Sequence, residues 1–194
     1  MMRGRPLKRE IRDNISAILS YVKYAYGYEI YKLYREIFGP ISLRNLYYNL
    51  KKGLVTGEFM IVDIKVVNGN FTWGGESQHI YYSLGPYSST LNIVNEKILE
   101  KLNALKPFEG LDINWEEQIN NHIDILEKEA SDFNSKKERM KYEDKFKTKE
   151  LLKNRCNKLK EWIKLKIDDK DKIRIYNARI NRIMDIVIKQ DNEE

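Results

Sequence analysis

The spacing of apolar residues changes once in the first half of the chain, at Gly57, and this change limits the folds that the chain can adopt. Before Gly57, apolar residues recur at intervals of three and four in residues 7–25, 28–37 and 43–54, which predicts three short amphipathic helices. Ser42 is the expected N-cap of the third helix. The predicted inner face of that helix consists of Leu43, Leu46, Tyr47, Leu50 and Leu54.

After Gly57 the sequence favours β-structure. Residues 59–67 are rich in Phe, Ile and Val, and they end at Asn68-Gly69, a pair that favours the two-residue turn of a β-hairpin. The elements expected after this turn are a return over residues 71–73, a bend at Gly74-Gly75 and a strand over residues 79–84. Three helices followed by a hairpin are typical of a winged helix-turn-helix, and we predict such a domain over residues 1–88.

The second half of the chain has a helical pattern. A helix is expected over residues 90–105, and three apolar seams with the spacing of a coiled coil follow. The seams are Ile119, Ile123, Leu126, Ala130 and Phe133, then Leu152, Cys156, Leu159 and Ile163, then Ile173, Tyr176, Ile180, Ile183 and Val187. We expect breaks at residues 131–135 and 168–172. The predicted fold class is α+β, mostly α, with a helical dimerisation or partner-binding region over residues 89–194.

The last seam also predicts the oligomeric state. It forms an apolar stripe that we expect one chain alone to leave uncovered, and such a stripe indicates a homodimer held by the C-terminal half.

Charge is distributed unevenly along the chain, whose formal net charge is +6. Residues 1–90 contain 12 Lys and Arg against 7 Asp and Glu, whereas the remainder contains 23 against 22. A local excess of positive charge attracts polyanions, because neutralising phosphates releases counterions. Nucleic acid is therefore the predicted partner.

The third predicted helix has the residues that such a partner needs. Its leucines face inward, so Arg44, Asn45, Tyr48, Lys51 and Lys52 are expected to face outward. Arg and Asn read base edges in a major groove, and Lys holds phosphates. We predict that Arg44 and Asn45 read sequence while Lys51 and Lys52 anchor phosphate. The alternative is an ordinary solvated helix surface.

Two other segments supply candidate contacts. The N-terminal Arg3-Gly4-Arg5-Pro6 resembles the core of an AT-hook, an extended segment whose Arg side chains enter a narrow minor groove. The other candidate residues are Lys8, Arg9 and Arg12 for phosphate contacts, and Asn70 and Trp73 in the predicted hairpin. For the arm and for Trp73, the competing interpretations are an ordinary terminus and an aromatic side chain that packs against the first helix.

The segment YGYEIYKLYREIFGPISLRNLYYNLKKGLVTGEF resembles the core of PadR-like winged-helix regulators, which pair a Gly-Tyr-Glu-Ile helix start with a Leu-Tyr-x-x-Leu recognition helix. The matching residues are Gly27, Tyr28, Glu29 and Ile30, followed by Leu46, Tyr47 and Leu50. IYYSL at residues 80–84 resembles the final wing strand of that family. The resemblance is distant, covers residues 10–88, and departs from the family pattern at Gly53 and Glu58. It implies a DNA-binding transcriptional regulator that dimerises through long C-terminal helices.

Other functional classes lack support in the sequence. Cys156 is the single cysteine, and His79 and His122 lack companions at metal-ligand spacing, so we expect no metal, cofactor or enzymatic activity. There is no signal peptide or long apolar segment, so we expect a cytoplasmic protein without a membrane partner. Two alternatives to a DNA-binding regulator stay open: an RNA-binding or ribosome-associated factor that uses the same basic face, and a protein-docking module.

Overall fold

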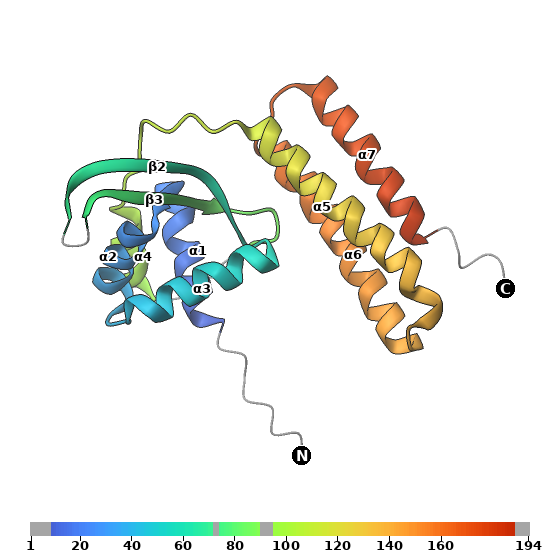
Figure 1. The fold of residues 1–194 in the computed structure, drawn as a ribbon, viewed down its shortest axis with the longest axis horizontal. Helices are drawn as coiled ribbons and strands as arrows, with labels where there is room; N and C mark the ends of the chain where they lie inside the picture. The colour runs from blue at the N-terminus through green and yellow to red at the C-terminus, as the bar shows by residue number, and fades with distance from the viewer. Residues whose placement is uncertain (1–8, 72–73, 90–94, 189–194) are drawn as a thin grey trace, which may run out of the picture. The chain divides into compact units, whose positions relative to one another are not determined.

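The computed structural model describes residues 9–71, 74–89 and 95–188, and the chain divides into an N-terminal unit, Met1–Ile113, and a C-terminal bundle, Asn114–Glu194 (Figure 1). The division lies later than the predicted boundary at residue 88. The reason is helix α4 (Glu96–Asn103), because its Leu102 is fully buried in the core of the N-terminal unit.

The N-terminal unit is a winged helix, as predicted. Its elements are α1 (Glu10–Val22), β1 (Tyr24–Tyr26), α2 (Gly27–Phe38), α3 (Leu43–Thr56), β2 (Phe59–Phe71), β3 (Gly74–Leu84) and α4. The strands form one antiparallel sheet in the order β1-β3-β2. Strand β1 was not predicted: three residues are too few to show a period, and they lie at the end of a helical pattern.

The core of this unit lies between the helices and the base of the sheet. Its fully buried side chains include Ile15, Ile18, Leu19, Ile30, Leu46, Leu50 and Phe59. The predicted inner face of α3 is thus correct at Leu46 and Leu50. It is wrong at Leu43 and Tyr47, which are 43% and 40% exposed. Tyr47 lies against the start of α2: a Cβ added at Gly27 would lie 2.7 Å from its hydroxyl oxygen, so a larger residue at Gly27 would displace the Tyr47 ring.

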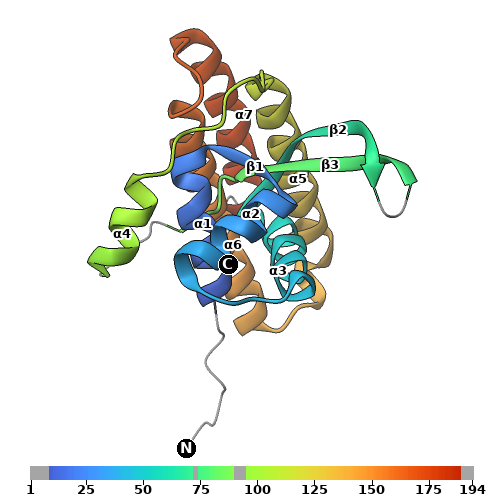
Figure 2. The same ribbon diagram turned by 90° about the vertical axis from the view of Figure 1, so that its left-hand side faces the viewer.

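The hairpin of β2 and β3, called the wing below, is longer than its turn signal indicates. The predicted turn at Asn68-Gly69 is wrong, because Asn68 pairs with Glu76 and the ladder continues to a pair between Phe71 and Gly74. A register shift between these two pairs accommodates Gly69, and glycine is common at such bulges. The longer ladder pairs more backbone groups than a turn at Asn68 would allow. Figure 2 shows this hairpin projecting from the helices of its unit.

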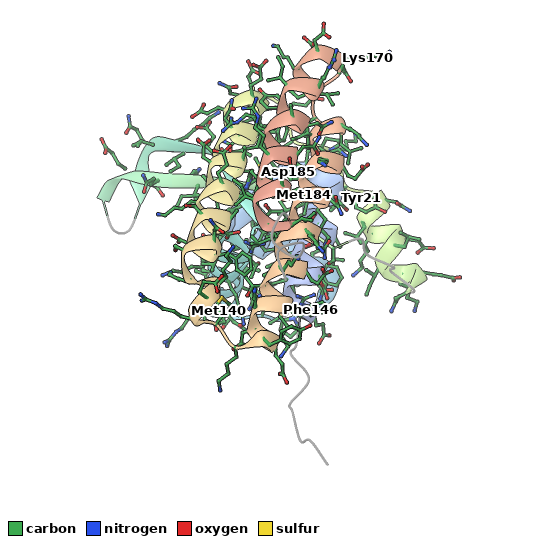
Figure 3. All side chains as sticks on the ribbon, turned by 90° about the vertical axis from the view of Figure 1, so that its right-hand side faces the viewer. Tyr21, Met140, Phe146, Lys170, Met184 and Asp185 are labelled. Atoms are coloured by element: carbon green, nitrogen blue, oxygen red, sulfur yellow. The ribbon has the colours of Figure 1, made fainter. Side chains whose placement is uncertain are left out.

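The C-terminal bundle contains three long helices. They are α5 (Trp115–Lys136), α6 (Tyr142–Lys164) and α7 (Lys170–Ile188), with a short 3-10 helix η1 (Lys137–Arg139) after α5. In Figure 3, Lys170 lies at one end of the bundle, and Met140 and Phe146 lie near the other. The predicted break at residues 131–135 is wrong, because α5 continues to Lys136. The second break is present but lies earlier than predicted, at residues 165–169, because residues 170–172 already belong to α7. Asp169 caps α7 by accepting backbone N–H bonds from Asp171 and Lys172.

The three apolar seams pack against one another within a single chain. The seam residues of α5 and α6 are buried, and so are Tyr176, Ile180, Ile183 and Val187 of α7. The premise of the predicted homodimer, that one chain leaves the last seam uncovered, is therefore wrong. Within residues 9–71, 74–89 and 95–188, the helices are too short or too polar to cross a membrane.

Candidate nucleic-acid interface

Helix α3 follows α2 after a connection of four residues, 39–42. Gly39, with φ of 101°, ends α2, and Pro40 follows it. The Ser42 hydroxyl oxygen then accepts a 3.2 Å hydrogen bond from the backbone N–H of Asn45, which confirms Ser42 as the N-cap. The cap fixes the start of α3, and therefore the direction in which the side chains of its first turn point.

The predicted outward face of α3 is exposed. Arg44, Asn45, Tyr48, Lys51 and Lys52 are all exposed, and the Tyr48 side chain retains 62% of its accessible surface. Helix α3 contains no Asp or Glu, so its cations have no acidic partner at helical spacing. The ion pairs found among the described residues include none of these three cations. The face combines available positive charge with hydrogen-bond donors.

Asn49 also belongs to this site, although it was not predicted. It is 8% exposed, and its amide nitrogen donates to the Asn45 backbone oxygen at 2.9 Å and to Asn45 Oδ1 at 3.0 Å. The hydrogen bonds from Asn49 thus fix the orientation of the Asn45 side chain. The signal that could have revealed it is the pair of asparagines four residues apart, a spacing that brings helical side chains into contact.

Arg12 does not belong to this surface, and its predicted phosphate contact is wrong. Arg12 is 7% exposed, and its Nε lies 2.9 Å from a carboxylate oxygen of Glu58. A cation that is buried and paired in this way is withdrawn from solvent and from phosphate. Arg9, one turn earlier, is exposed.

The remaining predicted contact residues are outside what the structure describes. Arg3, Arg5, Lys8 and Trp73 lie outside the described residues, and the side chain of Asn70 is not described either. Their proposed contacts with nucleic acid therefore stay predictions.

The wing adds little positive charge. Between Phe59 and Leu84 the sequence contains one Lys, Lys65, and two acidic residues, Asp63 and Glu76. A further acidic residue, Glu58, lies just before this range. Lys65 Nζ lies 3.7 Å from the Asp63 carboxylate and 5.6 Å from the centre of the Tyr81 ring. Its charge is thus partly engaged within the wing, and α3 presents the stronger positive surface.

The two histidines and the cysteine pack against other side chains of the fold. The His79 ring stacks on Tyr26 with centroids 4.2 Å apart. His122 lies edge-on to Trp162, and burial lowers the pKa of its imidazole to about 4. Cys156 is buried as predicted, and burial raises the pKa of its thiol to about 11, which disfavours the nucleophilic thiolate. The described residues contain no cluster of three potential metal ligands.

Comparisons with known proteins give limited information. No protein-family model matches the chain, and no curated protein is significantly similar to it. Among solved structures, the crystal structure of Bacillus subtilis PadR in complex with operator DNA matches with 14% sequence identity and a TM-score of 0.27, over 90% of this chain and 98% of that chain. At this TM-score the two chains do not superpose as wholes. The winged helix is recognised from the chain's own element order and sheet pairing.

Proposed function

We propose that the protein binds double-stranded DNA with α3 in the major groove, as a transcriptional regulator or an architectural factor. One observation carries this proposal: the exposed face of α3 holds three cations, Arg44, Lys51 and Lys52, and the helix contains no acidic residue. A helix of this kind, in the third position before a wing, matches the way winged helix-turn-helix domains read DNA.

The position of each residue along α3 suggests its role. Arg44 and Asn45 are in the first turn, the part of a recognition helix that approaches base edges. Lys51 and Lys52 are two turns later, where a recognition helix leaves the groove floor and passes the backbone, so they are assigned to phosphate. Arg9, and the arm residues Arg3, Arg5 and Lys8, would add sequence-independent contacts.

A homodimer is retained as part of this proposal, on a different surface from the one first expected. The buried seams do not support it, but Ile175 and Ile186 on α7 remain 62% and 49% exposed. A dimer would place two copies of α3 on successive half-sites of a duplex. Measuring the mass of the full chain in solution tests this part separately.

RNA is the second candidate ligand, and one observation favours it. Tyr48 is exposed at the centre of the basic face, and unpaired RNA bases stack on such aromatic rings. The wing, with its single Lys, also offers little to the backbone of a DNA duplex.

A binding titration separates the two candidates. The full chain is titrated against a DNA duplex, an RNA hairpin and a single-stranded RNA of matched length, over a series of salt concentrations. We expect the DNA duplex to bind most tightly, with an affinity that falls steeply as salt rises, because phosphate contacts release counterions. If either RNA binds more tightly than the DNA duplex, α3 is an RNA-binding surface and the DNA proposal is wrong. If none of the three nucleic acids binds, the protein-docking module replaces both proposals.

A further inference from the structure

Asn45 and Asn49 form a defined hydrogen-bonded pair on α3. The Asn49 side-chain nitrogen donates both to the backbone oxygen of Asn45 and to Asn45 Oδ1, at 2.9 and 3.0 Å. Asn49 is 8% exposed, whereas Asn45 is exposed. Asn49 is thus too buried to contact a ligand, and it acts on the side chain that can.

The chemistry of the pair fixes the orientation of both amides. A backbone carbonyl oxygen only accepts hydrogen bonds, so the group that Asn49 presents to it must be the NH2 group. The atom of Asn45 that meets the same NH2 group must also be an acceptor, which is Oδ1. The amide of Asn45 is planar, so its NH2 group points away from Asn49.

An asparagine held in this way differs from a free one in what it can read. A free Asn pairs with adenine by accepting from N6 and donating to N7, which requires both ends of its amide. In Asn45 the oxygen faces Asn49 and the NH2 group faces away from it, so the end of the amide that is presented outward is a donor. Its neighbour Arg44 also only donates. The first turn of α3 therefore matches a base edge that only accepts, which in the major groove is guanine, with O6 and N7.

We infer that Asn49 is a positioning residue that makes Asn45 a hydrogen-bond donor, and that the first turn of α3 consequently selects guanine over adenine. This inference rests on the proposed function, since it concerns the bases that α3 reads in a DNA duplex. It names the specificity of the site, and the residue behind that specificity is one that the nucleic acid does not touch.

The test is a selection from DNA duplexes with a randomised core, carried out with four full-length proteins. They are the wild type, Asn49→Asp, Asn49→Leu and Asn45→Ala. We expect the wild type to prefer guanine at one position by about five-fold or more, the discrimination typical of a good base contact. Asn49→Leu releases Asn45 and should remove most of this preference. Asn45→Ala, an exposed substitution that leaves the fold intact, should remove it as well.

Asn49→Asp gives the most specific result. An aspartate at this position accepts and does not donate, so it loses the hydrogen bond to the Asn45 backbone oxygen, attracts the NH2 group of Asn45 and turns Oδ1 outward. The preference at the same position should then move from guanine toward adenine, which loss of packing alone would not produce. Introducing Asn49→Asp into the Asn45→Ala protein should produce no such change, because the side chain that it reorients is absent.

The outcomes that overturn the inference are distinct from those that overturn the proposed function. Equal base preferences in the wild type, Asn49→Asp and Asn49→Leu overturn the inference and leave DNA binding by α3 in place. If the Asn49 variants do not fold, an Asn45→Ala protein whose guanine preference is unchanged at every position overturns the inference. An adenine preference that Asn45→Ala abolishes overturns it as well. Failure of the wild type to enrich any duplex overturns the proposed function, and the inference with it.

Discussion

The two units of the chain differ in where their charged side chains lie and in whether those side chains are paired. The N-terminal unit pairs a buried cation, Arg12, with the partly buried Glu58, and it leaves the cations of α3 exposed and outside the ion pairs found among the described residues. The C-terminal bundle buries a titratable group, His122, whose lowered pKa keeps it neutral. On its surface, several cations are paired: Arg179 contacts Asp124 and Glu127, Lys172 contacts Glu116, and Arg155 contacts Glu129.

The difference shows that the number of basic residues does not locate a nucleic-acid surface. Residues 114–188 contain 19 Lys and Arg, far more than the three of α3, but they also contain 15 Asp and Glu. Helix α5 alone has six acidic residues, and cations of α6 and α7 pair with them. A cation that is already paired with a carboxylate can neutralise a phosphate only if that ion pair breaks. The absence of acidic residues from α3, rather than the number of its cations, distinguishes this helix from those of the bundle.

The largest effect is expected from breaking the buried pair of the N-terminal unit. Arg12→Ala leaves the partly buried Glu58 without its partner, and this should lower the free energy of unfolding by about 3 kcal/mol. Chemical denaturation followed by circular dichroism measures the loss. The matched control is the double variant Arg12→Met, Glu58→Leu, which removes both charges and should recover most of the stability. A double variant as unstable as Arg12→Ala would show that the pair itself holds the unit together.

The buried histidine of the bundle should make its stability depend on pH. The pKa of His122 is about 4 in the folded chain and about 6.5 in the unfolded chain, so the unfolded state takes up a proton first as the pH falls. Stability from this residue is complete above pH 6.5 and declines between pH 6.5 and 4, by about 2 kcal/mol at pH 5. Trp115 and Trp162 report unfolding of the bundle by fluorescence. His122→Phe retains an aromatic contact with Trp162 and should remove this part of the pH dependence, whereas an unchanged dependence would assign it to carboxylates.

The sequence was informative where a signal is local and repeated. Spacings of three and four located the helices, and the polar residue before α3 predicted its cap at Ser42. It was uninformative where a partner is distant. The contact of Arg12 with Glu58 joins residues far apart in the chain, and an apolar seam does not specify whether its partner is in the same chain. At Asn68-Gly69 the sequence favours a turn, but the strands continue past this pair to Phe71, because each added pair of strand residues contributes backbone hydrogen bonds.

Removing equal charge from the two units tests the comparison directly. Replacing Arg44, Lys51 and Lys52 of α3 by Ala should weaken duplex binding by about a hundredfold or more, because each contact contributes roughly 1 to 3 kcal/mol at a base or about one unit of salt slope at a phosphate. The control variant replaces Lys153, Lys164 and Lys172 of the bundle by Ala, and each of these lysines is paired with a glutamate. We expect it to bind within a few-fold of the wild type. Similar losses in both triple variants would mean that total charge governs binding.

The smallest effect is expected from single lysines, and it sharpens the comparison most. Lys52→Ala removes one proposed phosphate contact, so it should weaken binding to all duplex sequences about equally and make the salt slope shallower by about one unit. Lys164→Ala on α6 removes the same charge, but this lysine is paired with Glu161, so the slope should stay unchanged. Arg44→Ala should behave differently from both, because it loses discrimination at particular base pairs while the slope changes little. Titrations at several salt concentrations on two unrelated duplexes separate the three cases. If Lys52→Ala weakens binding to one duplex much more than to the other, Lys52 contacts bases and not the phosphate backbone.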